Sequence, residues 1–268
     1  MLLGWTVLPK IVVMNKINPM QSMRFYKILS FIALFGFSCD TALDSPEISS
    51  APFVSISAPA TLTAGTSTDL TAFAQDGSQT PLRSAKITLL SGSTVISTNS
   101  AIATSNKLDL KIAGSVVAAQ RAGAYKLEVE AEDVAGQKAT TSKEITFACT
   151  APASCKETGK TTVIVITPPT TPANVKIGLI GSLTGWSTDI LMTKIAGTDN
   201  CFCAAVTFPN GSEFKFRRSE TATSNPDWNF VEKEEDCEEL DNRKQSAAPD
   251  ATVILTVANW RNTGTCPN

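Results

Sequence analysis

A strand of alternating aromatic and basic residues carries the side chains best placed for ligand chemistry. Phe214 and Phe216 alternate with Lys215 and Arg217 in the segment SEFKFRR, which is the period-two pattern of a strand with one buried and one solvent-facing side. Lys215 and Arg217 should therefore point outward together as hydrogen-bond donors.

Two tryptophans flank this strand in the sequence. Trp186 follows Gly185, and Trp228 lies between Asp227 and Asn229, so both are expected on loops. The C–H face of a pyranose ring packs on an aromatic plane while its hydroxyls need hydrogen-bond partners. Two loop tryptophans beside outward-facing cations therefore predict a sugar-binding surface.

The composition excludes much of enzyme chemistry. The 268 residues are 18% charged and 43% hydrophobic and include no histidine. A histidine-dependent nucleophile, general base or metal ligand is thus excluded. The length has room for about two domains of roughly 100 residues each, and no cofactor is expected.

The charge distribution argues against an anionic partner. The first 39 residues hold four of the 23 cationic side chains and no acid, so 19 cations and 25 acids remain, a net charge of −6. Nucleic acid and an anionic membrane surface are therefore disfavoured, and a neutral ligand is favoured.

Residues 1–39 read as a signal region. From Met23, the expected start (with Met14 and Met20 as alternatives), a short basic head precedes an apolar run and Cys39. The run is about eleven residues long, too short to span a bilayer. The segment resembles the lipobox of bacterial lipoproteins, with Gly36 where Leu is usual. This implies a lipid-modified Cys39 and anchoring in the outer membrane, at the cell surface; plain secretion is the alternative.

Six cysteines remain after Cys39. An even number outside the cytoplasm favours up to three disulfides, with fifteen possible connectivities. Cys149 and Cys155 are close enough in sequence to close one small loop. A zinc–thiolate site is the alternative, but an oxidising compartment disfavours it, so no metal is expected. The disulfide candidates are Cys149, Cys155, Cys201, Cys203, Cys237 and Cys266.

The predicted fold is all-β, with two tandem β-sandwiches. After a polar tether (40–51), residues 52–149 contain seven short alternating runs, typical of an Ig-like sandwich. The segment around Tyr125 resembles the closing hairpin of bacterial Ig-like and PKD-like spacers. The runs are FVSISA, STDLTAFAQ, SAKITLL, TVIST, KLDLKIA, AYKLEVEAED and TSKEITFA.

A Thr- and Pro-rich linker (150–173) with a short strand at Thr162–Thr167 should lead to a second sandwich (174–268). Strands are expected there at Val175–Ile180, Phe202–Phe208, Glu213–Arg217 and Thr252–Val257.

The acidic run Glu232–Glu239 invites a catalytic or calcium-binding interpretation. Glycoside hydrolysis needs two carboxyls at a fixed separation in a cleft, one with a raised pKa. A run of acids on a surface loop offers neither. We expect a solvated loop held by Cys237, and no enzyme.

Five motifs in the same order resemble the family 20 starch-binding module. They are GLIGSLTGW, VTFPNGSEFKFRR, PDW, DNR and ATVILTVANWR, and they cover roughly residues 174–262. The order GW, FKFR and DW also resembles the C-terminal modules of SusE and SusF type outer-membrane starch-binding lipoproteins.

The resemblance implies a site in which Trp186 and Trp228, set at an angle, flank the glucan. Lys215 and Asn242 would hydrogen-bond its hydroxyls. Asn229 stands where the family usually has Glu and opens an acidic insertion (229–240).

The family's second site uses tyrosines at positions that here are Gly178 and Cys203, so that site should be missing. Trp260 matches a structural position.

The implied function is a non-catalytic surface lipoprotein that holds starch or maltooligosaccharide. A separate hydrolase and an outer-membrane glycan transporter would be its partners. The alternative is a structural or protein-interaction lipoprotein whose C-terminal sandwich no longer binds sugar. Exposure of the two tryptophans should discriminate between these functions.

Overall fold

The computed structural model describes residues 50–76, 81–103, 105–246 and 248–267. The signal region, the lipidation site Cys39 and nearly all of the 40–51 tether lie outside these residues. Within them the chain is nearly all β, as predicted, and is divided among several sheets. None of the helices in these ranges is long and apolar enough to cross a bilayer.

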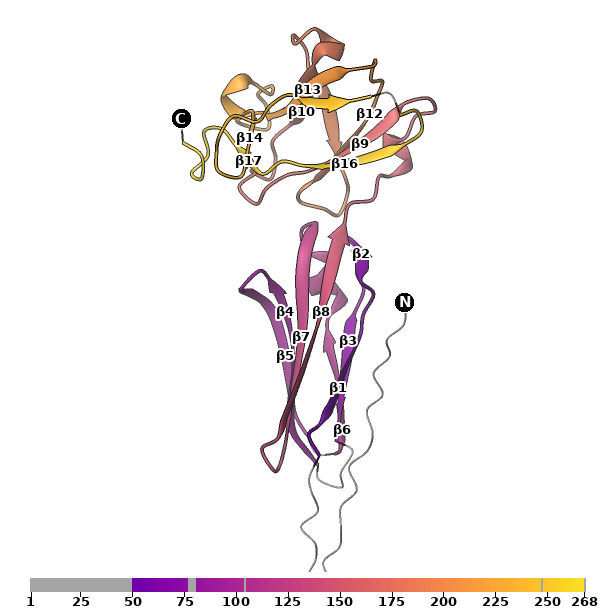
Figure 1. Ribbon diagram of the computed structural model, residues 1–268, viewed down its shortest axis with the longest axis vertical. Coiled ribbons are helices and arrows are strands. Elements are labelled where there is room, and N and C mark those ends of the chain that lie inside the picture. Colours follow the sequence, from indigo (N-terminus) through magenta and orange to yellow (C-terminus); the bar gives the residue numbers. More distant parts are fainter. Residues whose placement is uncertain (1–49, 77–80, 104, 247, 268) are drawn as a thin grey trace, which may run out of the picture. The chain divides into compact units, whose positions relative to one another are not determined.

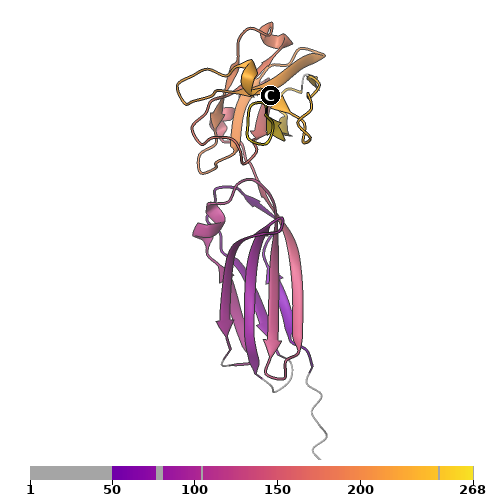
Figure 2. The same ribbon diagram turned by 90° about the vertical axis from the view of Figure 1, so that its left-hand side faces the viewer.

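The N-terminal part forms two sheets (Figures 1 and 2). One has the order β1-β3-β6, and the other has the order β2-β8-β7-β4-β5. All pairs are antiparallel except β2 with β8. The elements are β1 (Phe53–Ser57), β2 (Thr61–Thr63), β3 (Leu70–Gln75), β4 (Leu82–Ser91), β5 (Thr94–Ile102), β6 (Lys107–Ile112), α1 (Gly114–Ala118), β7 (Gly123–Asp133) and β8 (Lys138–Ala148).

All seven strands expected in this part are present, and β3, β6, β7 and β8 alternate more buried and more exposed residues. β7 shows the principle: Tyr125, Leu127, Val129 and Ala131 are buried, and the residues between them are partly exposed. The side chains on the inner faces of both sheets form one hydrophobic cluster. The three-residue strand β2 was not predicted, because it is too short for a periodic signal.

The C-terminal part is built on a seven-stranded sheet with the order β15-β13-β10-β11-β12-β9-β16. β14 and β17 form a separate pair beside it (Figure 1). The strands are β9 (Thr161–Ile166), β10 (Ile177–Gly181), β11 (Ile190–Lys194), β12 (Cys201–Val206), β13 (Ser212–Arg218), β14 (Glu232–Lys233), β15 (Arg243–Gln245), β16 (Thr252–Thr256) and β17 (Asn259–Trp260), with 3-10 turns η1 (Ala153–Cys155), η2 (Ser182–Thr184) and η3 (Trp228–Phe230).

β9 corrects the expected linker. It pairs antiparallel with β12 and parallel with β16, and Thr161 to Val165 are all buried. Val163 and Val165 belong to the C-terminal hydrophobic cluster, whereas Ile164 packs in the other cluster. A strand buried on both faces has a continuous apolar run instead of an alternating one. The short strand expected at Thr162–Thr167 is therefore present, but it belongs to the seven-stranded sheet and not to a linker, so this sheet begins by Thr161.

The six cysteines form three disulfides, as predicted in number. The pairs are Cys149–Cys201, Cys155–Cys203 and Cys237–Cys266. The suggested Cys149–Cys155 disulfide is therefore wrong, and the alternative of a zinc–thiolate site is excluded because its cysteines are oxidised. Cys201 and Cys203 are two residues apart on β12, so their side chains share one face of the strand and meet the segment that carries the other two. Three disulfides indicate an extracytoplasmic protein.

Candidate functional site: a stacked tryptophan pair

The loop between β10 and β11 fixes Trp186 in an uncommon backbone conformation. Gly185 and Trp186 have φ angles of 58° and 57°, and the Trp186 N–H donates to the Gly181 carbonyl (2.9 Å). Non-glycine residues rarely adopt this left-handed region, and for a bulky residue it is an outlier. The turn thus holds the half-buried Trp186 side chain at some cost in backbone strain.

The second tryptophan, Trp228, begins the 3-10 turn η3. The Asp227 carboxylate accepts a hydrogen bond from the Asn229 N–H (2.7 Å), and Arg261 donates to the Trp228 carbonyl (3.2 Å). Trp228 as a whole residue is 43% exposed. Its backbone is therefore fixed, while much of its ring faces solvent.

The structure brings these two rings into contact. Their centroids are 6.2 Å apart, with 29° between the planes, which lies within the range of direct aromatic pairs. Two rings at this separation stack on each other, so a pyranose does not fit between them. The structure thus brings the two expected tryptophans together, as a stacked pair and not as two separated platforms. A ligand would instead lie across the exposed side of the pair.

Arg217 also differs from its expected role. Its Nε and Nη2 atoms donate to the two carboxylate oxygens of Asp189 (2.7 Å each), and its Cζ atom lies 5.1 Å from the Trp228 ring centroid. Arg217 is buried, because Asp189 and Trp228 cover this part of the outer face of β13. The prediction of a free, outward donor is wrong.

Lys215 lies on β13, two residues before Arg217. Asn242 directly precedes β15, the strand that pairs with β13. The half-buried Lys215 donates from Nζ to the Leu240 carbonyl, which anchors the end of the acidic insertion. Asn242 donates to a Glu213 carboxylate oxygen (3.0 Å). This bond, followed by the charge of Lys244, lowers the pKa of Glu213. Both expected sugar donors therefore have intramolecular partners.

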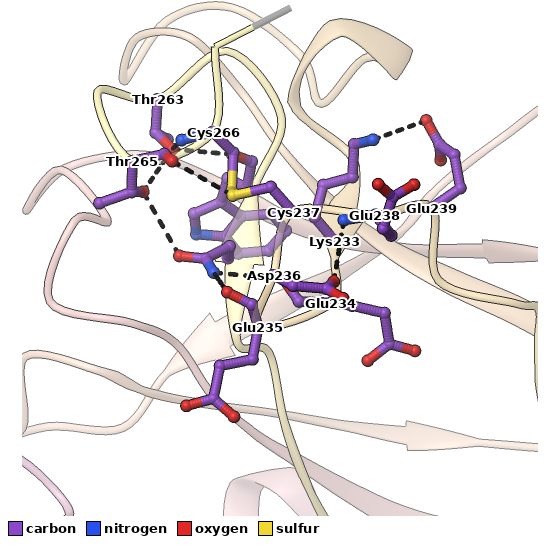
Figure 3. Close-up of a disulfide and its surroundings, with 12 residues drawn as sticks. Lys233, Glu234, Glu235, Asp236, Cys237, Glu238, Glu239, Thr263, Thr265 and Cys266 are labelled. Carbon is purple, nitrogen blue, oxygen red and sulfur yellow. Dashed lines mark hydrogen bonds and ion pairs between the residues drawn. A yellow bond between two sulfur atoms is a disulfide. The ribbon is translucent and has the colours of Figure 1, made fainter.

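The acidic run is a cross-linked loop (Figure 3). Lys233 pairs with Glu239 (2.9 Å), which also pairs with Arg261, and Cys237 is bonded to Cys266. The Glu235 carboxylate points away from those of Glu238 and Glu239. In the described part of the chain no group of three or more acids, cysteines or histidines is arranged to hold a metal ion.

Glu232, the first acid of the run, is fully buried and structural. Its carboxylate accepts from the Phe216 N–H (2.8 Å) and from Nε and Nη2 of Arg243 (2.9 and 2.8 Å). Burial raises the pKa of Glu232, and the hydrogen bonds from Arg243 oppose this effect. On this side of β13, β15 pairs with residues 212–214 and Val231 pairs with Arg217. The Glu232 carboxylate satisfies the Phe216 N–H that lies between these two pairings.

Asp189 is the site residue that sequence reasoning missed. It is a single acid before an apolar strand, and its partner lies 28 positions away. An ion pair between residues so far apart produces no recognisable pattern in the local sequence. Trp260, in contrast, is buried as expected, and its Nε1–H donates to Thr171 Oγ1 (2.8 Å).

No protein-family model matches this sequence, and no curated protein matches it. Among solved structures, the chain is similar to one described as giving structural insight into host cell surface retention of a 1.5-MDa bacterial ice-binding adhesin. The identity is 12% and the TM-score 0.25, over 66% of this chain and 62% of that chain.

A second similar structure is a tetra-tandem repeat from the extending region of a large adhesion protein. The identity is 13% and the TM-score 0.30, over 73% of this chain and 48% of that chain. This chain thus spans less than two thirds of either structure, and the similarity assigns no family.

Proposed function

We propose that this protein is a non-catalytic, extracytoplasmic carbohydrate-binding protein. Its C-terminal part, built on the seven-stranded sheet, would hold a sugar chain on the Trp186–Trp228 pair, and the N-terminal Ig-like sandwich would act as a spacer. The lipobox resemblance adds an outer-membrane lipid anchor at Cys39, with a glycan transporter and a surface hydrolase as partners.

The observation that carries this proposal is the exposed tryptophan pair. Two loops that are distant in sequence place indole rings 6.2 Å apart, and Trp228 remains 43% exposed. A large exposed aromatic surface is costly to leave in water and is typical of a binding site. Indole faces are the surfaces that pack against sugar C–H groups.

The sequence resemblance supplies the ligand class, an α-glucan such as starch or maltooligosaccharide. With Lys215, Asn242 and Arg217 all bonded internally, stacking would provide most of the binding energy. An aromatic contact contributes about 0.5–1.5 kcal/mol beyond area burial. A single site should therefore be weak, with a Kd on the order of 10 µM to 1 mM.

The internal bonding of those same donors also favours the second candidate function, a protein-interaction or structural role. An aromatic pair whose neighbours Lys215, Asn242 and Arg217 are bonded internally can pack against a protein partner as well. The two candidates differ in whether the purified protein binds sugar by itself.

The test is isothermal titration of the oxidised mature chain with maltoheptaose, and with a β-1,4-glucan of equal length as the control ligand. Heat with the α-glucan alone supports the proposal. Trp228→Ala should then weaken binding about tenfold or more, the loss of roughly 1.4 kcal/mol.

Phe53→Ala is the matched control variant, because Phe53 is another exposed aromatic (60%) on the N-terminal sheet; it should bind normally. If the wild type gives no binding heat with either glucan, the protein-interaction role is favoured. Equal affinity in Trp228→Ala and wild type would remove the tryptophan pair as the site.

A further inference from the structure

Trp186, Trp228, Arg217 and Asp189 form a chain of side-chain contacts whose two ends belong to one loop. Trp186 stacks on Trp228, and Trp228 lies under the Arg217 guanidinium. Arg217 pairs with Asp189, which is three residues after Trp186 in the same loop. Displacing Arg217 or Asp189 should therefore loosen the contact that holds Trp228.

We propose that Arg217 and Asp189 are positioning residues that hold Trp228 against Trp186 before any ligand arrives. This inference rests on the proposed function and deepens it, because it names the residues that set the affinity of the site without touching the sugar.

The ion pair is built for rigidity. Both side chains are only 9% exposed, and the guanidinium meets the carboxylate through two parallel N–H···O bonds of 2.7 Å. Bidentate pairs fix both planes, and a lysine in place of arginine cannot do this. Arg217 is itself fixed on β13, which is paired with β10 on one side.

The room for this pair comes from Gly178 on β10. Gly178 is directly opposite Arg217 in the β10–β13 register. A Cβ atom at this position would lie 2.7 Å from Asp189 Oδ1 and 2.8 Å from Asp189 Cβ. A side chain here would therefore push Asp189 off Arg217. The glycine found where the family has a tyrosine thus has a structural reason.

The arrangement restricts which part of the pair can meet a ligand. The face of Trp228 beneath Arg217 is occupied, so the sugar must use the remaining exposed surface. The charge of Arg217 is compensated by Asp189. The site should therefore take a neutral sugar chain, with an affinity nearly independent of salt.

The experiment compares Arg217→Lys with Arg83→Lys in the oxidised full-length chain. Arg83 also pairs with a carboxylate, Glu132 (3.0 Å), but on the N-terminal sheets. Two measurements are made: the far-UV circular dichroism couplet of the coupled indoles without ligand, and the affinity for maltoheptaose.

Arg217→Lys should reduce the couplet and weaken binding about three- to tenfold, the range of a partly desolvated cation–π contact. Arg83→Lys should change neither. An unchanged couplet in Arg217→Lys would overturn the inference. A couplet that falls while maltoheptaose affinity stays at the wild-type value would also overturn it.

If the wild type binds no glucan, the proposed function is contradicted. A reduced couplet in Arg217→Lys would in that case still support the positioning role of Arg217. Gly178→Ala provides a second variant in case Arg217→Lys does not fold. It leaves both charges in place and should reduce the couplet by displacing Asp189, and an unchanged couplet there counts against the inference too.

Discussion

At the scale of single residues, the site depends on side chains held in unusual ways. Trp186 has a left-handed backbone, Arg217 is buried against Asp189, and Glu232 is buried against Arg243. Each arrangement has an energetic cost that its contacts must offset. Costs of this kind concentrate where a protein needs a fixed surface.

The backbone of Trp186 leads to a stability prediction. Trp186→Gly should be more stable than Trp186→Ala by about 0.5–1 kcal/mol, because glycine has no Cβ to conflict with a positive φ. Urea unfolding of both variants measures the difference. At Ser187, which is exposed and does not have a positive φ, the order should reverse. A more stable alanine variant at position 186 would contradict this explanation.

At the scale of elements, the short strands β14 and β17 depend on cross-links between the loops next to them. β14 and β17 are two residues each, too short to be stable alone. The Cys237–Cys266 disulfide and the Glu239 ion pairs hold the segments around them. The acidic loop 229–240 is therefore a structural element of the C-terminal part of the chain.

Glu239 should make this loop sensitive to acid. Hydrogen bonding to Lys233, and then to Arg261, lowers the pKa of Glu239 below its ordinary 4.5. The stabilisation is thus complete above the unfolded-state pKa and is lost as the pH falls through the lower folded-state pKa.

Glu239→Gln should destabilise the protein at pH 6 and have little effect near pH 2, as measured by urea unfolding. Glu235→Gln is the matched control, because Glu235 forms no salt bridge within the described ranges. An equal loss at both pH values would contradict the prediction.

At the scale of the whole molecule, β9 decides where the C-terminal part begins. β12 and β16 both hydrogen-bond to β9, and Thr171 accepts the hydrogen bond from Trp260. A boundary at residue 174 would therefore remove a strand that is paired on both sides and the hydrogen-bond partner of the fully buried Trp260.

A fragment of residues 161–268 should fold cooperatively, and a fragment of residues 174–268 should not. Both would carry Cys201→Ala and Cys203→Ala, because the partners of these cysteines are absent. Near-UV circular dichroism during thermal unfolding distinguishes the two. A cooperative transition in the shorter fragment at the same temperature would show that β9 is dispensable.

The amino-acid sequence by itself determined the strands with a local alternating signal, such as β7 and β13, and the class of the fold. It also determined the number of disulfides, through an even cysteine count, and it placed Trp186 and Trp228 on loops. The strands and the loop positions depend on neighbouring residues, so a short window of sequence contains the information, and the disulfide number needs only a count of cysteines.

Only the tertiary structure decided which residues meet. Cys149 bonds to Cys201, 52 positions away, and Arg217 bonds to Asp189, 28 positions away. The outward side of β13 is covered at Arg217 by a loop from another strand, so alternation alone could not predict its burial. Strand order and loop closure bring these groups together, and both arise from packing that no local pattern records.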